Sequence, residues 1–144
     1  MESTREQTIE TLLVSVNRLI RTALQSTGNT TSQAVWRTLG ILESGGTQRL
    51  GELAKASRVS QPTMTRLVAG MLADDLVVRS VDPDDSRGQR IALAPAGAER
   101  LAAWRATLTH TVGPLFADLD EAQWDVLHEA SALIASRTRS EITA

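Results

Sequence analysis

The chain contains no cysteine and no tyrosine, and only one of its 144 residues is phenylalanine. The absence of cysteine excludes a disulfide framework, a thiol redox switch, a cysteine-ligated zinc site and an iron–sulfur cluster. No apolar run approaches the roughly 18 residues that a membrane-spanning helix needs. The N-terminal segment MESTREQTIE is polar and of mixed charge, which is not typical of a signal peptide. We therefore expect a cytoplasmic protein.

Patterns that carry catalysis or bind metal ions are also missing from the sequence. It has no phosphate-binding loop, no GxSxG nucleophile motif and no Cys–His pair. The two histidines, His110 and His128, fall on different expected helices and have no acidic cluster to share, so a metal site is not expected. We expect neither an enzyme nor a bound cofactor.

The formal net charge of −2 conceals an uneven distribution of charge along the chain. Residues 49–73 carry four basic groups against one acidic group, a net charge of +3. Residues 106–144 carry two basic groups against six acidic groups, a net charge of −4. A basic segment of this kind is suited to a polyanionic partner, and the acidic C-terminal part is expected to face away from it.

Helical periodicity dominates the two ends of the chain. Apolar residues recur at spacings of three and four near the N-terminus, which is typical of an amphipathic helix. The same spacing recurs in the last third of the sequence, on both sides of Pro114. The expected helices cover residues 5–26, a segment from Thr31 or Ser32 to about residue 43, a long segment from Pro95 whose apolar repeat reaches Leu115, with a break marked by Pro114 and residues 118–120, and residues 121–138.

The middle of the chain combines short helical segments with two β-rich segments. Ser60 is suited to cap a helix, and Pro62 fits the first turn of that helix, where a missing N–H costs least. The β-branched and alternating residues further on predict two antiparallel strands joined by a polar loop. The expected elements are a short helix at 50–57, a helix from Ser60 to about residue 74, a strand at 76–81, a loop at 82–88 and a returning strand at 89–94.

This order of elements predicts a mainly α fold with a small β-hairpin wing. The fold is a winged helix-turn-helix flanked by N- and C-terminal dimerisation helices. The expected division places the N-terminal part of the dimerisation region at 1–34, the winged helix-turn-helix DNA-binding domain at 35–100 and the C-terminal dimerisation helices at 101–144.

The second helix of such a unit is narrow enough to enter the major groove of DNA, where exposed donors and acceptors contact base edges. Met64, Leu67 and Met71 form the stripe expected to be buried. Polar residues lie off that stripe, and an arginine from the hairpin fits the adjacent minor groove, where the potential is most negative. The polar residues of the helix are Gln61, Thr63, Thr65 and Arg66.

Two segments of the sequence resemble a known family. LAKASRVSQPTMTRLV is similar to the helix-turn-helix of MarR-type bacterial transcription regulators. DPDDSRGQRIALAPAGAERL is similar to the wing of that family and to the helix that follows it. The most recognisable local pattern is Asp85-x-Arg87-Gly88, followed by a strand and by a small residue–x–x–Gly that spans Ala94 to Gly97. The order of the flanking helices extends the resemblance over the whole chain.

The resemblance implies a homodimer that binds a pseudo-palindromic operator, usually as a repressor, and is often released by a small aromatic or amphipathic ligand. Asp85 is then expected to orient Arg87, while the acidic residues Asp82, Asp84 and Asp85 weaken electrostatic contact at the base of the wing. The expected DNA-binding residues are Arg58, Ser60, Gln61, Pro62, Thr63, Thr65, Arg66, Arg87 and Arg90.

Arg58 departs from a common pattern of helix-turn-helix units. Many of these units have glycine in the turn, four residues after the alanine of the first helix, and in this chain that position after Ala54 is Arg58. A left-handed conformation at a non-glycine residue costs roughly 1–2 kcal/mol. We expect contact with a phosphate to offset part of this cost.

Two further hypotheses concern the apolar residues. Trp36, Trp104 and Met71 either fill the core, which is the favoured interpretation, or line a pocket for the effector ligand. The outer helices carry more apolar surface than a single chain of this length is expected to leave exposed, which favours a dimer. The alternative function is a winged helix that binds other proteins and no operator. The expected dimer-interface residues are Leu12, Leu13, Val16, Leu19, Leu115, Trp124, Leu127 and Ile134.

Overall fold

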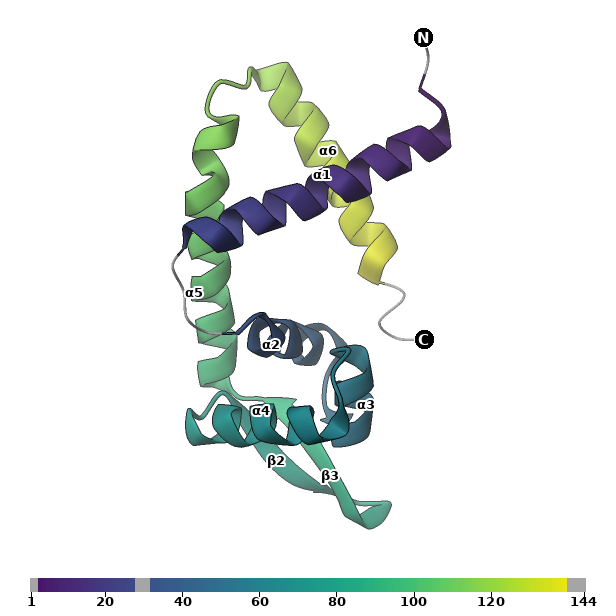
Figure 1. Ribbon diagram of the computed structural model, residues 1–144, viewed down its shortest axis with the longest axis vertical. Helices are drawn as coiled ribbons and strands as arrows, with labels where there is room; N and C mark the ends of the chain where they lie inside the picture. Colours follow the sequence, from purple (N-terminus) through teal and green to yellow (C-terminus); the bar gives the residue numbers. More distant parts are fainter. Residues whose placement is uncertain (1–2, 28–31, 140–144) are drawn as a thin grey trace. The chain divides into compact units, whose positions relative to one another are not determined.

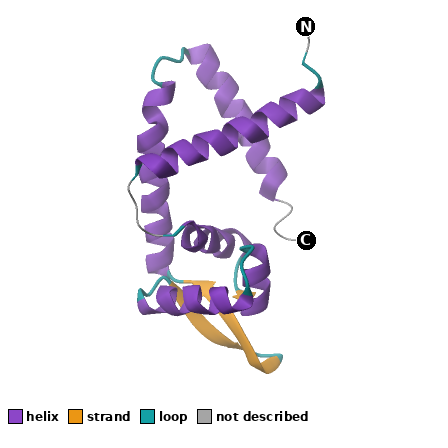
Figure 2. Ribbon diagram, in the orientation of Figure 1, coloured by secondary structure: helices purple, strands orange, loops and turns teal. Residues whose placement is uncertain are grey.

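The computed structural model describes residues 3–27 and 32–139, apart from the side chains of residues 85–87. It is mainly helical, with one small antiparallel sheet, as the sequence predicts (Figures 1 and 2). Within the described ranges the elements are α1 (Arg5–Ser26), α2 (Gln33–Gly45), β1 (Gln48–Arg49), α3 (Leu50–Ala56), α4 (Gln61–Ala73), β2 (Val77–Asp82), β3 (Asp85–Leu93), α5 (Pro95–Val112), the 3-10 helix η1 (Gly113–Phe116) and α6 (Glu121–Thr138).

The chain divides into two compact units. One consists of residues 1–30 and 104–119, and the other consists of residues 31–103 and 120–144. Within the described residues, no helix is both long enough and apolar enough to cross a membrane.

Helix α1, in the first unit, begins at a capping box. The Thr4 hydroxyl accepts a hydrogen bond from the Gln7 backbone N–H at 3.1 Å, and the Thr4 N–H donates to the Gln7 side chain at 2.8 Å. These two bonds satisfy backbone donors that a helix start otherwise leaves to water. Only Ala23 is buried among the described residues of α1, so its apolar stripe remains exposed.

The second unit has a core to which α2, α3, α4 and the sheet all contribute. The buried residues of α4 repeat at helical spacing, which explains why this segment forms an amphipathic helix. Burying a leucine, isoleucine or methionine side chain contributes about 1.5–3 kcal/mol, so a handful of such residues stabilises the unit substantially. The leucine, isoleucine and methionine residues of this core with 2% exposure or less are Leu39, Leu42, Leu53, Met64, Met71, Ile91 and Leu101.

A buried polar contact joins α2 to the turn after α3. Thr38 donates its hydroxyl proton to the Ala34 carbonyl at 2.7 Å, which leaves its oxygen to accept from the Ser57 hydroxyl at 3.1 Å. Arg37 Nη1 donates to the Ser57 carbonyl at 2.8 Å. Since unsatisfied buried polar groups are costly, these bonds fix the position of the turn that leads into α4.

The sheet has the strand order β1-β3-β2, with both pairings antiparallel. The prediction of a polar loop over residues 82–88 is wrong. Asp82 pairs with Asp85, so only Pro83 and Asp84 form the turn, and β3 begins at Asp85. The Asp82 carboxylate accepts a hydrogen bond from the Asp84 N–H at 3.0 Å, which closes the turn locally and lets the strands extend.

Candidate nucleic-acid interface

Helix α4 begins at Ser60, as its sequence predicts. The Ser60 Oγ accepts a hydrogen bond from the Thr63 N–H at 3.2 Å and donates to the Thr63 hydroxyl at 2.8 Å. Pro62 lies in the first turn and lacks the N–H that this position would leave unpaired. The helix start is therefore rigid, and its positive dipole end lies at an exposed surface suited to an anion.

The two faces of α4 differ in chemistry. Met64, Val68 and Met71 are buried against the core. Gln61 and Arg66 are exposed and Thr63 is half-buried, while the exposed Thr65 donates its hydroxyl to the Gln61 carbonyl at 2.9 Å. Arg66 Nη2 is 3.4 Å from the Thr63 hydroxyl. The exposed face thus presents amide, hydroxyl and guanidinium groups, which are the groups that contact base edges and phosphates.

Arg58 occupies the turn immediately before α4. Its backbone is left-handed, with φ of 57°, so the cost considered for a non-glycine residue at this position applies. The Arg58 side chain is exposed. Arg58 therefore places a cation, in addition to Arg66, next to the start of α4.

The tip of the wing carries the residues of the Asp85-x-Arg87 pattern. Their backbone belongs to β3, beside the turn at Pro83 and Asp84. The side chains of Asp85 and Arg87, and with them the expected ion pair, lie outside the described part of the structure. The minor-groove role of Arg87 therefore stays a prediction.

Asp82 and two arginines form an ion-pair cluster at the base of the wing. Arg49 Nη2, from β1, lies 2.5 Å from Asp82 Oδ2, and Arg90 Nη2, from β3, lies 3.3 Å from Asp82 Oδ1. The Asp82 side chain is fully buried, whereas that of Arg49 is 48% exposed and that of Arg90 is 35% exposed. The hydrogen bond from the Asp84 backbone, together with both guanidinium groups, holds the pKa of Asp82 below its ordinary value although burial acts in the opposite direction.

The cluster corrects the expectation that Asp82 weakens electrostatic contact at the base of the wing. Asp82 does not present free negative charge to a partner, because it is buried and two cations neutralise it. The three groups together carry a net charge of +1. Sequence analysis missed Arg49, since its strand has two residues and its partners lie far along the chain.

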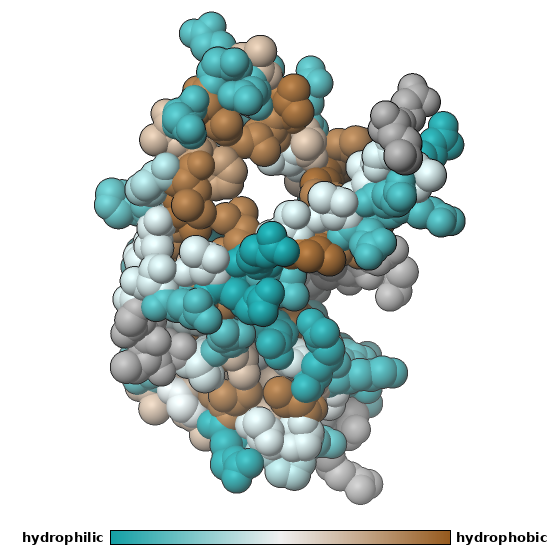
Figure 3. Space-filling model, turned by 45° about the horizontal axis from the view of Figure 1, so that its top comes forward, coloured by the Kyte–Doolittle hydropathy of each residue, from teal (hydrophilic) through white to brown (hydrophobic). Residues whose placement is uncertain are grey.

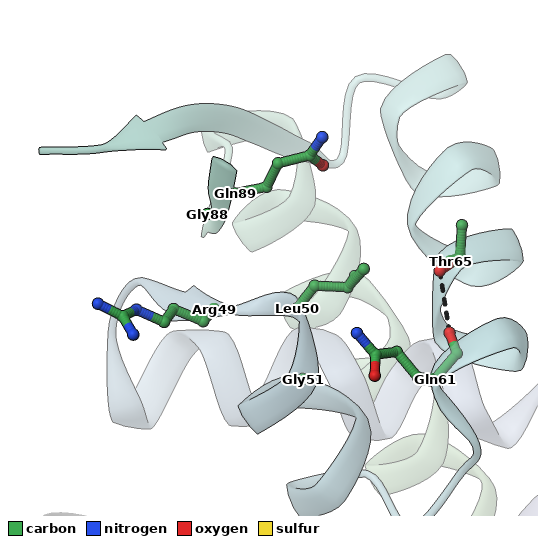
Figure 4. A pocket seen from close by; sticks show the side chains of 7 residues that line it. All are labelled: Arg49, Leu50, Gly51, Gln61, Thr65, Gly88 and Gln89. Carbon is green, nitrogen blue, oxygen red and sulfur yellow. Dashed lines mark hydrogen bonds between the residues drawn. The ribbon is translucent and has the colours of Figure 1, made fainter. Parts of the chain in front are cut away.

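A hollow of about 370 Å³ lies beside this cluster. In Figure 4, Arg49 lies on the left of the hollow, Gln61 and Thr65 of α4 lie on the right, and Gln89 of β3 lies above. The hollow therefore adjoins the exposed face of α4, β1 and the wing within one compact unit.

The remaining predicted site residues differ in burial. Trp36, Met71 and Trp104 are buried, at 9%, 2% and 7% exposure, as core residues are. The proposed interface residues lie at the surface of the single chain. Leu19 and Leu127 are partly exposed, and the members with 37–65% exposure are Leu12, Leu13, Val16, Leu115, Trp124 and Ile134.

A capped helix with an exposed polar face, a short helix before it and a β-hairpin after it define a winged helix-turn-helix DNA-binding protein. Comparison with known proteins agrees. Residues 29–88 match the model of the MarR family. An uncharacterised HTH-type transcriptional regulator, Mb0904 of Mycobacterium bovis, is 30% identical over 96 residues, which cover 67% of each chain. The chain belongs to the MarR family of transcriptional regulators.

Solved structures share the fold. The crystal structure of RV1404 from Mycobacterium tuberculosis has a TM-score of 0.70 at 19% identity, covering 96% of this chain and 97% of that one. A structure of BpsR from Bordetella bronchiseptica has a TM-score of 0.56 at 21% identity, covering 90% of this chain and 98% of that one. The BpsR structure concerns the regulation of DNA binding of that protein by 6-hydroxynicotinic acid.

Proposed function

We propose that the protein is a homodimeric repressor that binds a pseudo-palindromic operator and leaves it when a small aromatic or amphipathic effector binds. The observation that carries the DNA-binding part is the exposed polar face of α4, bordered by Arg58 and by the Arg49–Asp82–Arg90 cluster. Phosphate contacts supply affinity that falls steeply with salt, and contacts from Gln61 and Thr63 to bases supply specificity.

Exposed apolar side chains on the outer helices support the dimer. Ile9, Leu13 and Ile20 of α1 are 50% exposed or more, and Trp124 and Leu133 of α6 are similarly exposed. Figure 3 shows brown, apolar side chains at the surface on the face that it displays, and large exposed apolar patches mark interaction sites. Burial of these side chains against a second copy sets the two α4 helices roughly 34–36 Å apart, one turn of DNA.

The effector part of the proposal is supported by the family and by BpsR, whose DNA binding is regulated by a small aromatic acid. Trp36, Met71 and Trp104 are the residues we propose to adjoin the ligand. Titration of aromatic acids should quench tryptophan fluorescence in the Trp124→Phe variant, which retains both buried tryptophans. No loss of duplex binding at saturating acid would contradict this part.

Selection of bound sequences from random duplex DNA, at stated salt, tests the function and supplies the operator. Enrichment of an inverted repeat is expected from a dimer. Enrichment of no sequence, combined with no salt-dependent duplex binding, would favour the alternative of a protein-binding winged helix. Sedimentation that shows a monomer at micromolar concentration would remove the dimer.

Arg87 has its own test. Arg87→Ala should weaken binding to any duplex and reduce the salt slope by about one unit. Arg100→Ala on α5 is the matched control, since it removes the same charge from an exposed position outside α4 and the wing. An equal effect of both variants would contradict a specific role for Arg87.

A further inference from the structure

Arg49 has the geometry of a ligand-binding cation, although it is not among the DNA-binding residues expected from the sequence. Its side chain is about half exposed and lies at the edge of the hollow, where Figure 4 shows it extending away from Gln61 and Thr65. A guanidinium group has five N–H donors, and only Nη2 of Arg49 pairs with Asp82. The remaining donors are available to a second acceptor.

Asp82 restrains this arginine. A free arginine on a surface strand loses side-chain entropy when it binds a phosphate, which weakens the contact. Asp82 is fully buried, and it holds Arg49 with one carboxylate oxygen and Arg90 with the other. The position of the Asp82 carboxylate is itself fixed by the hydrogen bond from the Asp84 backbone. The arginine is thus pre-organised by a carboxylate that has little freedom to move.

The hollow has the chemistry that a sugar–phosphate strand needs. Its lining combines the Arg49 cation with the polar side chains of Gln61, Thr65 and Gln89 and with two glycines, Gly51 and Gly88, whose lack of side chains permits close approach. The lining residues that the structure describes include no carboxylate. A volume of about 370 Å³ is in the range of small-ligand sites.

We propose that the hollow between β1, α4 and β3 seats one strand of the DNA backbone, that Arg49 binds a phosphate of this strand at the edge of the hollow, and that Asp82 is the positioning residue that holds Arg49. This inference rests on the proposed DNA-binding function and adds a phosphate site to it. The contact is independent of sequence, so it contributes to affinity and register.

Removal of the Asp82 charge should change duplex affinity in the direction opposite to the one that charge repulsion alone predicts. Removal of a negative charge near a DNA-binding surface should tighten binding, because it reduces repulsion of the phosphates. If Asp82 positions Arg49, its removal should instead weaken binding. Asp84 is the matched control, since it is exposed in the same turn and neither arginine of the cluster pairs with it.

The experiment measures binding of the full-length protein to a fluorescein-labelled duplex of mixed sequence by anisotropy over a range of salt. We expect Asp84→Asn to bind as well as the unaltered chain or more tightly, and Asp82→Asn to bind several-fold more weakly. Arg49→Gln should reduce the salt slope by about one unit, since one phosphate contact releases about one counterion. Arg49→Lys should largely retain the slope, because it keeps the charge.

Coupling between the residues separates positioning from a merely structural role. If Asp82 acts through Arg49, Asp82→Asn should weaken binding little further in the Arg49→Gln background. Additive losses, an unchanged salt slope in Arg49→Gln, or tighter binding by Asp82→Asn would each overturn the proposal. If Asp82→Asn does not give a cooperative thermal transition, the slopes of Arg49→Gln and Arg49→Lys decide the question. Absence of salt-dependent binding by the unaltered chain would instead refute the proposed function itself.

Discussion

Gly97 is the position where a single methyl group should disturb the fold most clearly. A Cβ atom added there would overlap the Leu76 carbonyl oxygen and lie 2.8 Å from Leu93 Cδ1. An ordinary non-bonded contact is about 3.5 Å, so the first turn of α5 and the backbone before β2 must separate by about 1 Å or more. The obstacle is backbone, which cannot rotate aside as a side chain does.

The expected cost of Gly97→Ala follows from these contacts. Overpacking of a well-packed site costs about 1–3 kcal/mol, and the contact with backbone places Gly97 at the upper end. The Leu76 carbonyl also accepts a hydrogen bond from the Ala94 N–H at 3.0 Å, which the same displacement weakens. Alanine regains about 1 kcal/mol as a better helix former. We expect a net loss of about 2–3 kcal/mol and a Tm lower by about 10 °C.

Gly70→Ala is the control for this prediction. Gly70 lies in α4, is exposed, and has no atom within 4 Å of a Cβ added to it. The same substitution should therefore raise stability by about 0.5–1 kcal/mol. Thermal unfolding followed by circular dichroism compares the two variants at one fixed protein concentration, because association shifts the apparent Tm. A Gly97→Ala variant as stable as the unaltered chain would refute the close approach, and so would one as stable as Gly70→Ala.

Substitutions at three other positions each test a single feature of the structure. Arg58→Gly should raise the free energy of unfolding in urea by about 1 kcal/mol, because glycine removes the strain of the left-handed backbone. Arg58→Ala keeps that strain and should not stabilise the chain. Weaker duplex binding by both variants would show that the Arg58 side chain contacts DNA. Ser60→Ala should lower stability by about 1 kcal/mol, since the Thr63 N–H loses its cap; no change in the urea midpoint would contradict this. The pKa of Asp82 lies below its ordinary value of 3.8, so the ionised carboxylate stabilises the fold above pH 3.8 and this contribution is lost as the pH falls through the lower pKa of the folded state. When the free energy of unfolding is followed through an acid titration, the decrease below about pH 4 should therefore be smaller in Asp82→Asn.

Features that depend on neighbours in the sequence could be predicted. The Ser60 cap and the buried stripe of α4 follow from residue types a few positions apart, and the structure has both, although Leu67 of the predicted stripe is only half-buried. The left-handed backbone at Arg58 follows from the geometry of the turn, which forces that conformation on whichever residue stands there. In each case the physical cause lies within one or two helical turns of the residue.

Features that depend on pairing across the sheet could not be predicted in the same way. Strand β1 has only two residues and exists because Gln48 and Arg49 pair with Ile91 and Arg90 of β3. The polar composition of residues 82–88 is typical of a loop, but the register of β2 against β3 continues the strands through most of this segment. Local propensity is a weak guide to strands, because cross-strand packing decides whether they form.

The acidic residues of the wing show how burial changes the meaning of a charge. Counted along the sequence, Asp82, Asp84 and Asp85 reduce the positive charge of the DNA-binding segment and should weaken its attraction for phosphate. In the folded unit Asp82 is buried, and its charge acts on Arg49 and Arg90 at hydrogen-bonding distance. Loss of conformational freedom by Arg49 then favours binding, while the cluster keeps a net charge of +1. The same carboxylate that lowers the charge of the surface thus makes one of its cations a better ligand for a phosphate, which is why substitution of Asp82 should weaken duplex binding and substitution of Asp84 should not.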